Sequence, residues 1–227
     1  MGPLPPRGAI AYHGRPPMNP RLIMFDFDGT LADSFGCFLD VADAVADRYG
    51  FARLDRSDMA AVRALGARQI IQRQGVPLWK VPMIARHART LMARDIDRVP
   101  LFAGIGTALA ELAAGGARLA IVTSNSRDNV LRVLGPATAA LVGELECGAS
   151  LFGKAGRLRR VLRRSRVPQS AALFVGDEIR DAEAARAAGV PFGAVAWGYT
   201  STAALRAQAP AHFFERVEDL SRLSNGR

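Results

Sequence analysis

The chain has few cysteines, few lysines and no long apolar run. Only two cysteines occur, Cys37 and Cys147, so no disulfide framework is expected and a reducing, cytoplasmic location is the default. No apolar run approaches the roughly 20 residues that a membrane-spanning helix needs. Residues 1–20 lack the apolar core of a secretory signal and are rich in proline, so we interpret them as a flexible tail.

The composition is that of a globular protein with an unusual choice of basic residue. The chain has 227 residues, of which 49% are hydrophobic and 22% charged, enough for one large domain or for a core with a smaller insert. Lysine occurs only at Lys80 and Lys154, so nearly all of the 30 basic residues are arginine. The net charge of +9 therefore indicates an arginine bias of the whole chain more than selection for one basic surface.

The order of apolar segments predicts an α/β fold. After residue 100, strand-like and helix-like segments alternate, which is typical of a Rossmann-like parallel sheet with helices on both faces. Residues 35–99 contain helix-like stretches only, so we expect a small α-helical cap there, inserted after the first strand, with residues 21–34 and 100–227 forming the core. The expected strands are 22–26, 118–123, 171–176, 192–196 and, more weakly, 211–214; the expected core helices include 104–115, 127–134 and 178–188.

Residues 22–34, LIMFDFDGTLADS, carry the most informative pattern. An apolar run leads to Asp26 and Asp28, which strand alternation places on one side of the backbone. Two converging carboxylates repel each other unless a cation or a shared proton relieves them. The alternative is a polar turn after a buried strand, since DG and GT are ordinary turn pairs. We favour a Mg²⁺ site with an aspartate nucleophile.

Two further segments place polar side chains next to buried elements. Residues 119–126, LAIVTSNS, end an apolar strand in hydroxyl and amide groups, which suit either phosphate binding or a helix N-cap. Lys154 lies four residues before Leu158 in an amphipathic helix, so it projects toward the buried side. A buried ammonium needs an anionic partner, although a lysine at a helix start can also extend to solvent.

A fourth segment repeats the pairing of a buried strand with carboxylates. In residues 173–190, LFVGDEIRDAEAARAAGV, Asp177 follows the strand directly, and Asp181 lies on the same face of the first helical turn. Acidic residues also favour helix N-termini, which is explanation enough for Glu178. Because parallel strands end at one edge of a sheet, the strand-end groups of these segments are expected to meet there.

Taken in this order, the four segments resemble the motifs of the haloacid dehalogenase-like (HAD) hydrolases, most of which are phosphatases. The resemblance covers nearly all of residues 21–200. It implies a Mg²⁺-dependent phosphatase in which Asp26 is the nucleophile and Asp28 is the general acid and base. The residues that it implies as metal ligands or supports are Asp26, Asp28 (through its backbone carbonyl), Asp177 and Asp181, and those that it implies around the phosphate are Thr123, Ser124, Asn125 and Lys154.

The substrate is less well specified than the reaction. Similarity in DFDGTLADS, GDEIRDAEAA and Trp197-Gly198-Tyr199 is closest to phosphoglycolate phosphatase-like members, which implies a small phosphorylated metabolite as partner. Arg68, Lys80 and His87 are cap candidates for substrate contacts, with a solvated helix face as the alternative. Two other functions stay open: a β-phosphoglucomutase-like phosphotransferase, and a nucleic-acid-binding module that uses the basic residues 157–166. The oligomeric state is not predicted.

Overall fold

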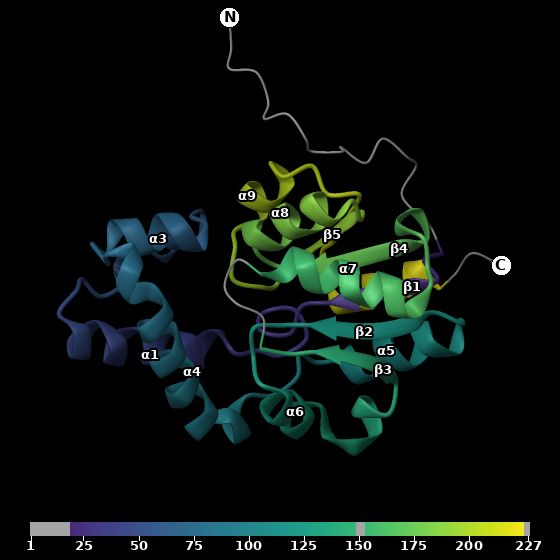
Figure 1. Cartoon of the computed structure of the whole chain (residues 1–227), viewed down its shortest axis with the longest axis horizontal. Coiled ribbons are helices and arrows are strands. Elements are labelled where there is room, and N and C mark those ends of the chain that lie inside the picture. Colours follow the sequence, from purple (N-terminus) through teal and green to yellow (C-terminus); the bar gives the residue numbers. More distant parts are fainter. Residues whose placement is uncertain (1–18, 149–152, 225–227) are drawn as a thin grey trace, which may run out of the picture.

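Parallel strands form one sheet in the centre of the larger part of the molecule (Figure 1). The computed structural model describes residues 19–148 and 153–224, so nearly all of the expected tail, residues 1–18, lies outside the described residues. The six strands have the order β3-β2-β1-β4-β5-β6, and all neighbours are parallel. Their bounds are β1 Leu22–Phe25, β2 Arg118–Val122, β3 Val142–Glu146, β4 Ala172–Gly176, β5 Phe192–Val195 and β6 His212–Phe214.

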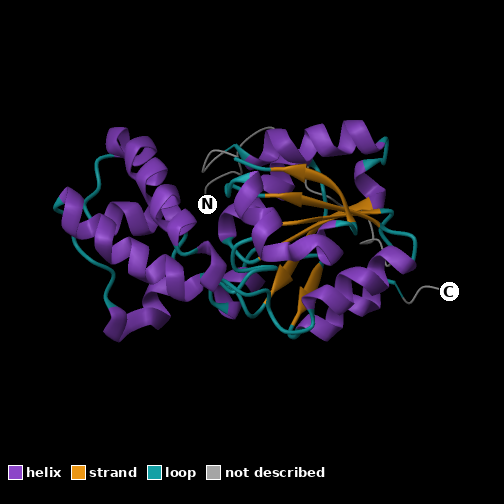
Figure 2. Cartoon of the chain, turned by 90° about the horizontal axis from the view of Figure 1, so that it is seen from below, coloured by secondary structure: helices purple, strands orange, loops and turns teal. Residues whose placement is uncertain are grey.

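Helices cover both faces of this sheet because its strands are apolar on both sides (Figure 2). Ile23 and Phe25 of β1 pack on one face, against α5, α6 and the 3₁₀ helix η5. Leu22 and Met24 pack on the other face, against α7, α8 and α9. The bounds are α5 Ile105–Ala114, α6 Arg127–Ala139, α7 Lys154–Ser165, η4 Gln169–Ala171, α8 Ile179–Ala188, α9 Thr202–Arg206 and η5 Val217–Leu223.

The segment between β1 and α5 forms a separate helical layer beside the sheet, the cap (Figures 1 and 2). Helices α1 and α4 pack on each other within it. The two connections to the core run antiparallel, since Asp33 N donates to Pro100 O at 2.9 Å and Phe102 N donates to Leu31 O at 3.0 Å. The cap comprises α1 Phe35–Tyr49, η1 Arg56–Asp58, α2 Met59–Arg63, α3 Ala67–Arg73, η2 Leu78–Lys80, α4 Val81–Arg94 and η3 Ile96–Arg98.

The structure confirms the predicted fold class and adds one strand. Strand β3 was not predicted, because Gly143, Glu144 and Glu146 interrupt its apolar pattern at the edge of the sheet. The helix expected over 127–134 is confirmed, since the non-helical Gly135, with a φ of 66°, separates it from the short remainder of α6 that ends at Ala139. Within the described residues, no helix is long and apolar enough to cross a membrane.

Candidate active site

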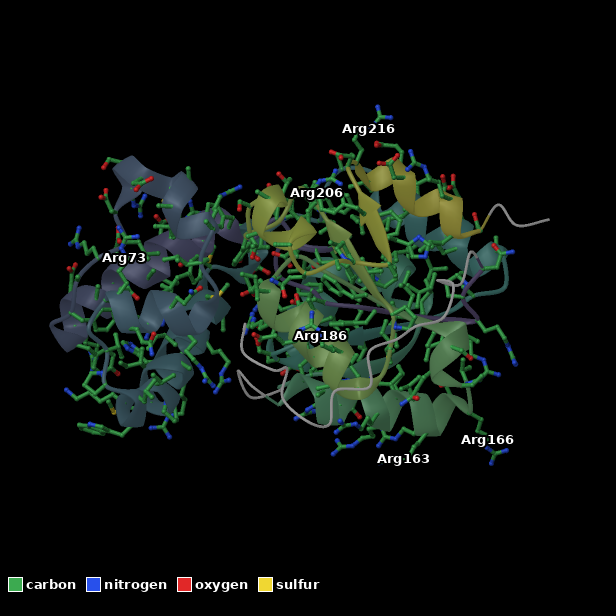
Figure 3. All side chains as sticks on the ribbon, turned by 90° about the horizontal axis from the view of Figure 1, so that it is seen from above. Arg73, Arg163, Arg166, Arg186, Arg206 and Arg216 are labelled. Carbon is green, nitrogen blue, oxygen red and sulfur yellow. The ribbon has the colours of Figure 1, made fainter. Side chains whose placement is uncertain are left out.

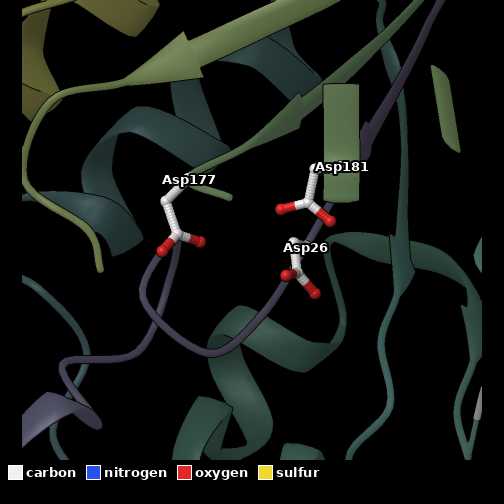
Figure 4. A group of neighbouring side chains, drawn as sticks. All are labelled: Asp26, Asp177 and Asp181. Atoms are coloured by element: carbon white, nitrogen blue, oxygen red, sulfur yellow. The ribbon is translucent and has the colours of Figure 1, made fainter. Parts of the chain in front are cut away.

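The carboxyl ends of the three central strands bring the candidate residues together. Asp26 follows β1, Asp177 follows β4, and Thr123 follows β2. The pairing of β1 and β4 continues for one more residue, since Asp26 N donates to Val175 O at 2.8 Å. Figure 4 shows the carboxylates of Asp26 and Asp177 facing the same space as that of Asp181, which comes from the first turn of α8. Oxygen atoms of these three side chains lie within 4.8 Å of one another.

Lys154 supplies a buried positive charge to this group. Its Nζ lies 2.8 Å from Asp26 Oδ2 and 2.6 Å from Asp181 Oδ1. The lysine is only 5% exposed, Asp26 2%, and Asp181 not at all. Burial lowers the pKa of Lys154, but attraction to Asp181 and Asp26 outweighs it and leaves the pKa above its usual value. The ammonium therefore stays charged and binds the two carboxylates together.

Asp177 is fixed by two donors and by a close fit to backbone. Thr30 Oγ1 donates to Asp177 Oδ1 at 2.7 Å, and Tyr199 N donates to Asp177 Oδ2 at 2.8 Å. A Cβ on Gly29 would lie 2.3 Å from Asp177 Oδ2, and one on Gly198 would lie 2.1 Å from Asp177 Cβ. Glycine at both positions lets two loops close on the carboxylate, which explains the Gly in DGT and in WGY.

Arg180 joins the site without having been singled out in the sequence. Its guanidinium Nη2 donates to Glu178 Oε1, and its side chain is 17% exposed. Burial lowers the pKa of Arg180, but Glu178, Asp181 and Asp26 raise it well above its usual value. In the sequence, Arg180 is marked only by its position between Asp177 and Asp181. The acidic residues around it are explained by the preference of acids for helix N-termini, so they gave no reason to expect a buried arginine.

Asp28 lies beside the buried group and is held by an amide. Asn125 Nδ2 donates to both carboxylate oxygens of Asp28, at 3.3 and 3.2 Å. The orientation of this amide is fixed, because its Oδ1 accepts from Ser126 N at 2.8 Å and from Asn129 Nδ2 at 2.9 Å. Thr123 Oγ1 accepts from Asn125 N at 3.0 Å, so the strand-end hydroxyl and amide belong to one network.

The electrostatic balance of the site favours a cation. Burial raises the pKa of Asp26 to about 7, even though Lys154 opposes that rise. The pKa of Asp177 is also raised well above its usual value, by burial first and then by Glu178 and Asp181. Burial likewise raises the pKa of Asp28. Buried carboxylates that share too little positive charge are suited to hold a metal ion through their oxygens.

A cavity of about 290 Å³ lies between the cap and these residues. Asp28, Ser124 and Arg180 line it on the core side, and Arg63 and Arg89 line it on the cap side. The cap candidates from the sequence are not among the residues that line it: Arg68, Lys80 and His87.

The contacts described for the Lys80 and His87 side chains are with other cap residues and not with the strand ends. Lys80 Nζ lies 5.2 Å from the ring centroid of Trp79, whose side chain is 76% exposed. The His87 ring packs edge-on against Tyr49, with centroids 5.7 Å apart. Their roles in substrate binding stay predictions.

Comparisons with known proteins agree with this architecture. The haloacid dehalogenase-like hydrolase family profile matches residues 23–195. A phosphoglycolate phosphatase of Synechococcus elongatus is 32% identical over 199 residues, covering 87% of this chain and 94% of that protein. The tyrosine-protein kinase PtkA of Mycobacterium tuberculosis is 30% identical, covering 81% of this chain and 65% of the kinase.

A similar solved structure supports the same family assignment. The crystal structure of a candidate phosphoglycolate phosphatase from Lactobacillus plantarum has a TM-score of 0.77 and 25% identity to this chain. The match covers 90% of this chain and 99% of that one. The chain therefore belongs to the haloacid dehalogenase-like hydrolases, as a phosphoric monoester hydrolase resembling the phosphoglycolate phosphatases.

Proposed function

We propose that this protein hydrolyses a small phosphomonoester, phosphoglycolate-like in its phosphate chemistry, through a phosphorylated Asp26 and with Mg²⁺. The observation that carries the proposal is the placement of Asp26 at the end of the central strand. There its carboxylate lies 2.8 Å from a buried lysine, within 4.8 Å of two further carboxylates, and two residues before Asp28. Such a group serves phosphoryl transfer, in which positioning and charge stabilisation supply most of the catalysis.

The donor set of the site fits Mg²⁺. Asp26 and Asp177 would hold the ion with side-chain oxygens, and the backbone carbonyl of Asp28 would be a third ligand, because Mg²⁺ prefers oxygen donors and keeps several waters. Asp181 would support the site, with Oδ1 bound to the ammonium of Lys154 at 2.6 Å and Oδ2 accepting from Glu178 N at 3.1 Å. When bound, the cation would neutralise charge on the phosphoryl oxygens.

In the first step, a carboxylate oxygen of Asp26 forms a bond to phosphorus while the ester P–O bond breaks. Lys154 stabilises charge on the phosphoryl oxygens, and the hydroxyls of Thr123 and Ser124 hold them in place. Asp28 gives its proton to the leaving oxygen. The raised pKa of Asp28 favours the protonated acid that this step needs, and Asn125 keeps the carboxyl group in position.

In the second step, Asp28 works in reverse. Its carboxylate takes a proton from a water molecule as that water attacks phosphorus. The bond from phosphorus to Asp26 breaks, inorganic phosphate leaves, and the free Asp26 carboxylate and protonated Asp28 are restored. One side chain can serve both steps because it faces the cavity next to the nucleophile.

The test is phosphate release from p-nitrophenyl phosphate and a panel that includes 2-phosphoglycolate, with and without Mg²⁺. We expect metal-dependent turnover that falls by at least about 10³-fold in Asp26→Asn, because the variant lacks the nucleophile. Asp33→Asn is the matched control, since Asp33 is exposed in the same loop. Turnover that is retained in Asp26→Asn, or that does not depend on Mg²⁺, would contradict the proposal.

The second candidate function is transfer of the phosphoryl group to another alcohol. A β-phosphoglucomutase-like activity belongs to this class. The observation in its favour is that one relative is named as a tyrosine-protein kinase. A phosphorylated Asp26 can react with a hydroxyl acceptor in place of water. Adding a sugar or tyrosine-peptide acceptor during turnover separates the two functions: a hydrolase gives one inorganic phosphate for each ester consumed, whereas a transferase gives less.

The nucleic-acid-binding hypothesis receives less support from the charges of α7. Three of its arginines form ion pairs with Glu144 and Glu146 of β3, and these are Arg157, Arg160 and Arg164. The labelled arginines in Figure 3 are spread from Arg73 on the cap to Arg163 and Arg216 on different sides of the core. A nucleic-acid surface gathers its basic residues in one stripe or patch, so we favour the phosphatase. The cytoplasmic location stays a prediction.

A further inference from the structure

The cavity above Asp28 is apolar over most of its wall. Its cap side is formed by side chains such as Phe38 and Val45 of α1, Ile70 of α3, and Ile84 and Met92 of α4. Polar residues line the core end, next to the candidate nucleophile, and the cap side carries Arg63, Gln74 and Arg89 among its apolar side chains. The cavity therefore offers a phosphate site at one end and an apolar space at the other, which we call the cap chamber.

Helix α4 shows that the cap chamber is hollow and not a closed core. Ile84, Ala88 and Met92 follow one another at intervals of four residues, so they share one face of α4, and all three line the chamber. None of the 14 residues of α4 is buried. In a packed bundle, the inner face of an amphipathic helix of this length would be buried. The cavity that keeps these side chains accessible has a volume of about 290 Å³.

The cap is closed on the core, so the chamber belongs to the site. Ser201 N, after β5, donates to the carbonyl oxygen of Arg63 in the cap at 2.7 Å. Tyr199 packs its ring against Phe35 and Phe38 of α1, with centroids 5.1 and 5.3 Å apart. The three rings form an aromatic wall of the chamber, which Asp28 also lines.

The guanidinium of Arg63 is directed to this aromatic wall. Its Cζ lies 4.1 Å from the centroid of the Phe35 ring, a cation–π contact. Arg63 and Arg89 nevertheless line the chamber, so recognition of a carboxylate is the competing use of this space. A two-carbon acid such as glycolate would leave most of the apolar wall in contact with water.

We propose that the preferred substrate is the phosphomonoester of an alcohol with an apolar body, the size of an aromatic ring or a medium-length alkyl chain. This inference rests on the proposed phosphatase function and specifies its substrate class. The phosphate lies at Asp26 and Asp28, and the body of the alcohol extends between α1, α3 and α4. Apolar side chains that water contacts in the empty chamber are covered by the substrate, which favours its binding.

An alkyl series tests the proposal with little change in leaving-group chemistry. Ethyl, butyl and hexyl phosphate are compared by kcat/KM at saturating Mg²⁺, beside 2-phosphoglycolate. We expect kcat/KM to rise about fourfold for each added methylene, the factor that corresponds to burial of one CH₂. A flat or falling series, or a preference for 2-phosphoglycolate over hexyl phosphate, would overturn the proposal and favour carboxylate recognition by the two arginines.

A pair of alanine variants locates the effect in the chamber. Ala88→Leu places added volume among the lining residues, whereas Ala60→Leu adds the same volume at an exposed position of α2. We expect the ratio of kcat/KM for hexyl over ethyl phosphate to fall about tenfold or more in Ala88→Leu, since the longer chain loses its space. The ratio should keep its wild-type value in Ala60→Leu. An unchanged ratio in Ala88→Leu would show that the alkyl chain binds elsewhere.

Binding of non-hydrolysable phosphonates separates this proposal from the phosphatase itself. Calorimetry with Mg²⁺ compares ethylphosphonate and hexylphosphonate on the full chain. Tighter binding of hexylphosphonate supports the chamber even if no ester is hydrolysed, in which case the proposed function alone fails. Equal binding of the two phosphonates overturns the chamber proposal, whatever the turnover.

Discussion

Replacing Lys154 with methionine should destabilise the protein far more than loss of an exposed ion pair. Methionine keeps much of the side-chain volume but removes the charge that lies 2.8 Å from Asp26 and 2.6 Å from Asp181. Both carboxylates are nearly inaccessible to water, so neither can be solvated in place of the lost partner. Removing one member of a buried charged pair costs about 3–5 kcal/mol in the free energy of unfolding.

Urea unfolding without Mg²⁺ measures this cost. With a typical urea dependence, a loss of this size moves the midpoint down by about 1–2 M. Arg53→Met is the control, because it breaks an ion pair with Asp47 in which both side chains are more than half exposed, at 59% and 54%. We expect its midpoint to stay close to the wild type.

A second substitution in the Lys154→Met background makes the reasoning sharper. Asp26→Asn removes one of the two uncompensated charges, so the double variant should be more stable than Lys154→Met alone. Coupling of this kind is expected for groups in one network. A midpoint for Lys154→Met as high as that of Arg53→Met, or no recovery in the double variant, would refute the view that Lys154 compensates buried carboxylates.

Three further predictions concern the metal, the acid and the glycine contacts. Mg²⁺ at about 100 times its Kd should raise the free energy of unfolding by about 2.7 kcal/mol in denaturant titrations. The Asp177→Asn variant should lose this stabilisation, and an equal stabilisation in the variant would argue against Asp177 as a ligand. Asp28→Asn should lower kcat/KM, which reports the first step, by about 10²–10⁴-fold for ethyl phosphate, and less for p-nitrophenyl phosphate, whose leaving group needs no proton; equal losses of kcat/KM would exclude the general-acid role. Gly198→Ala should lower the free energy of unfolding by about 1–3 kcal/mol in thermal or urea unfolding, because its Cβ would lie 2.1 Å from Asp177 Cβ. The control Gly156→Ala, with no atom within 4 Å of its Cβ, should be neutral or stabilising.

Local sequence patterns predicted the strands and helices whose apolar residues follow one regular spacing. The apolar runs of β1, β2 and β4 are buried on both faces, so each could be recognised without knowledge of its neighbours. Strand β3 lies at the sheet edge and carries Gly143 among polar residues, so its pairing with β2 decides its structure. Gly135 and Pro136 were correctly read as a helix end, because the helical geometry of α6 is broken at Gly135 before its last few residues.

Site residues could be predicted from the sequence at positions where a charged side chain has no structural explanation. Asp26, Lys154 and Asp177 stood out because each ends or begins a buried element with a group that is costly to bury. Thr30, Tyr199 and Arg180 received no role from the sequence, because their contacts depend on loops that meet only in the folded chain. The cap chamber was likewise invisible in the sequence, since its apolar residues have the same spacing as those of a packed core.

The central claim is that phosphate passes through Asp26. The most direct test mixes enzyme, Mg²⁺ and ethyl phosphate, quenches the mixture in acid within the first turnover, and reduces it with borohydride, which converts an acyl phosphate into an alcohol. Peptide mass spectrometry should then find residue 26 converted to homoserine, and residue 28 unchanged. Rapid phosphate release with no modification at residue 26 would contradict the account.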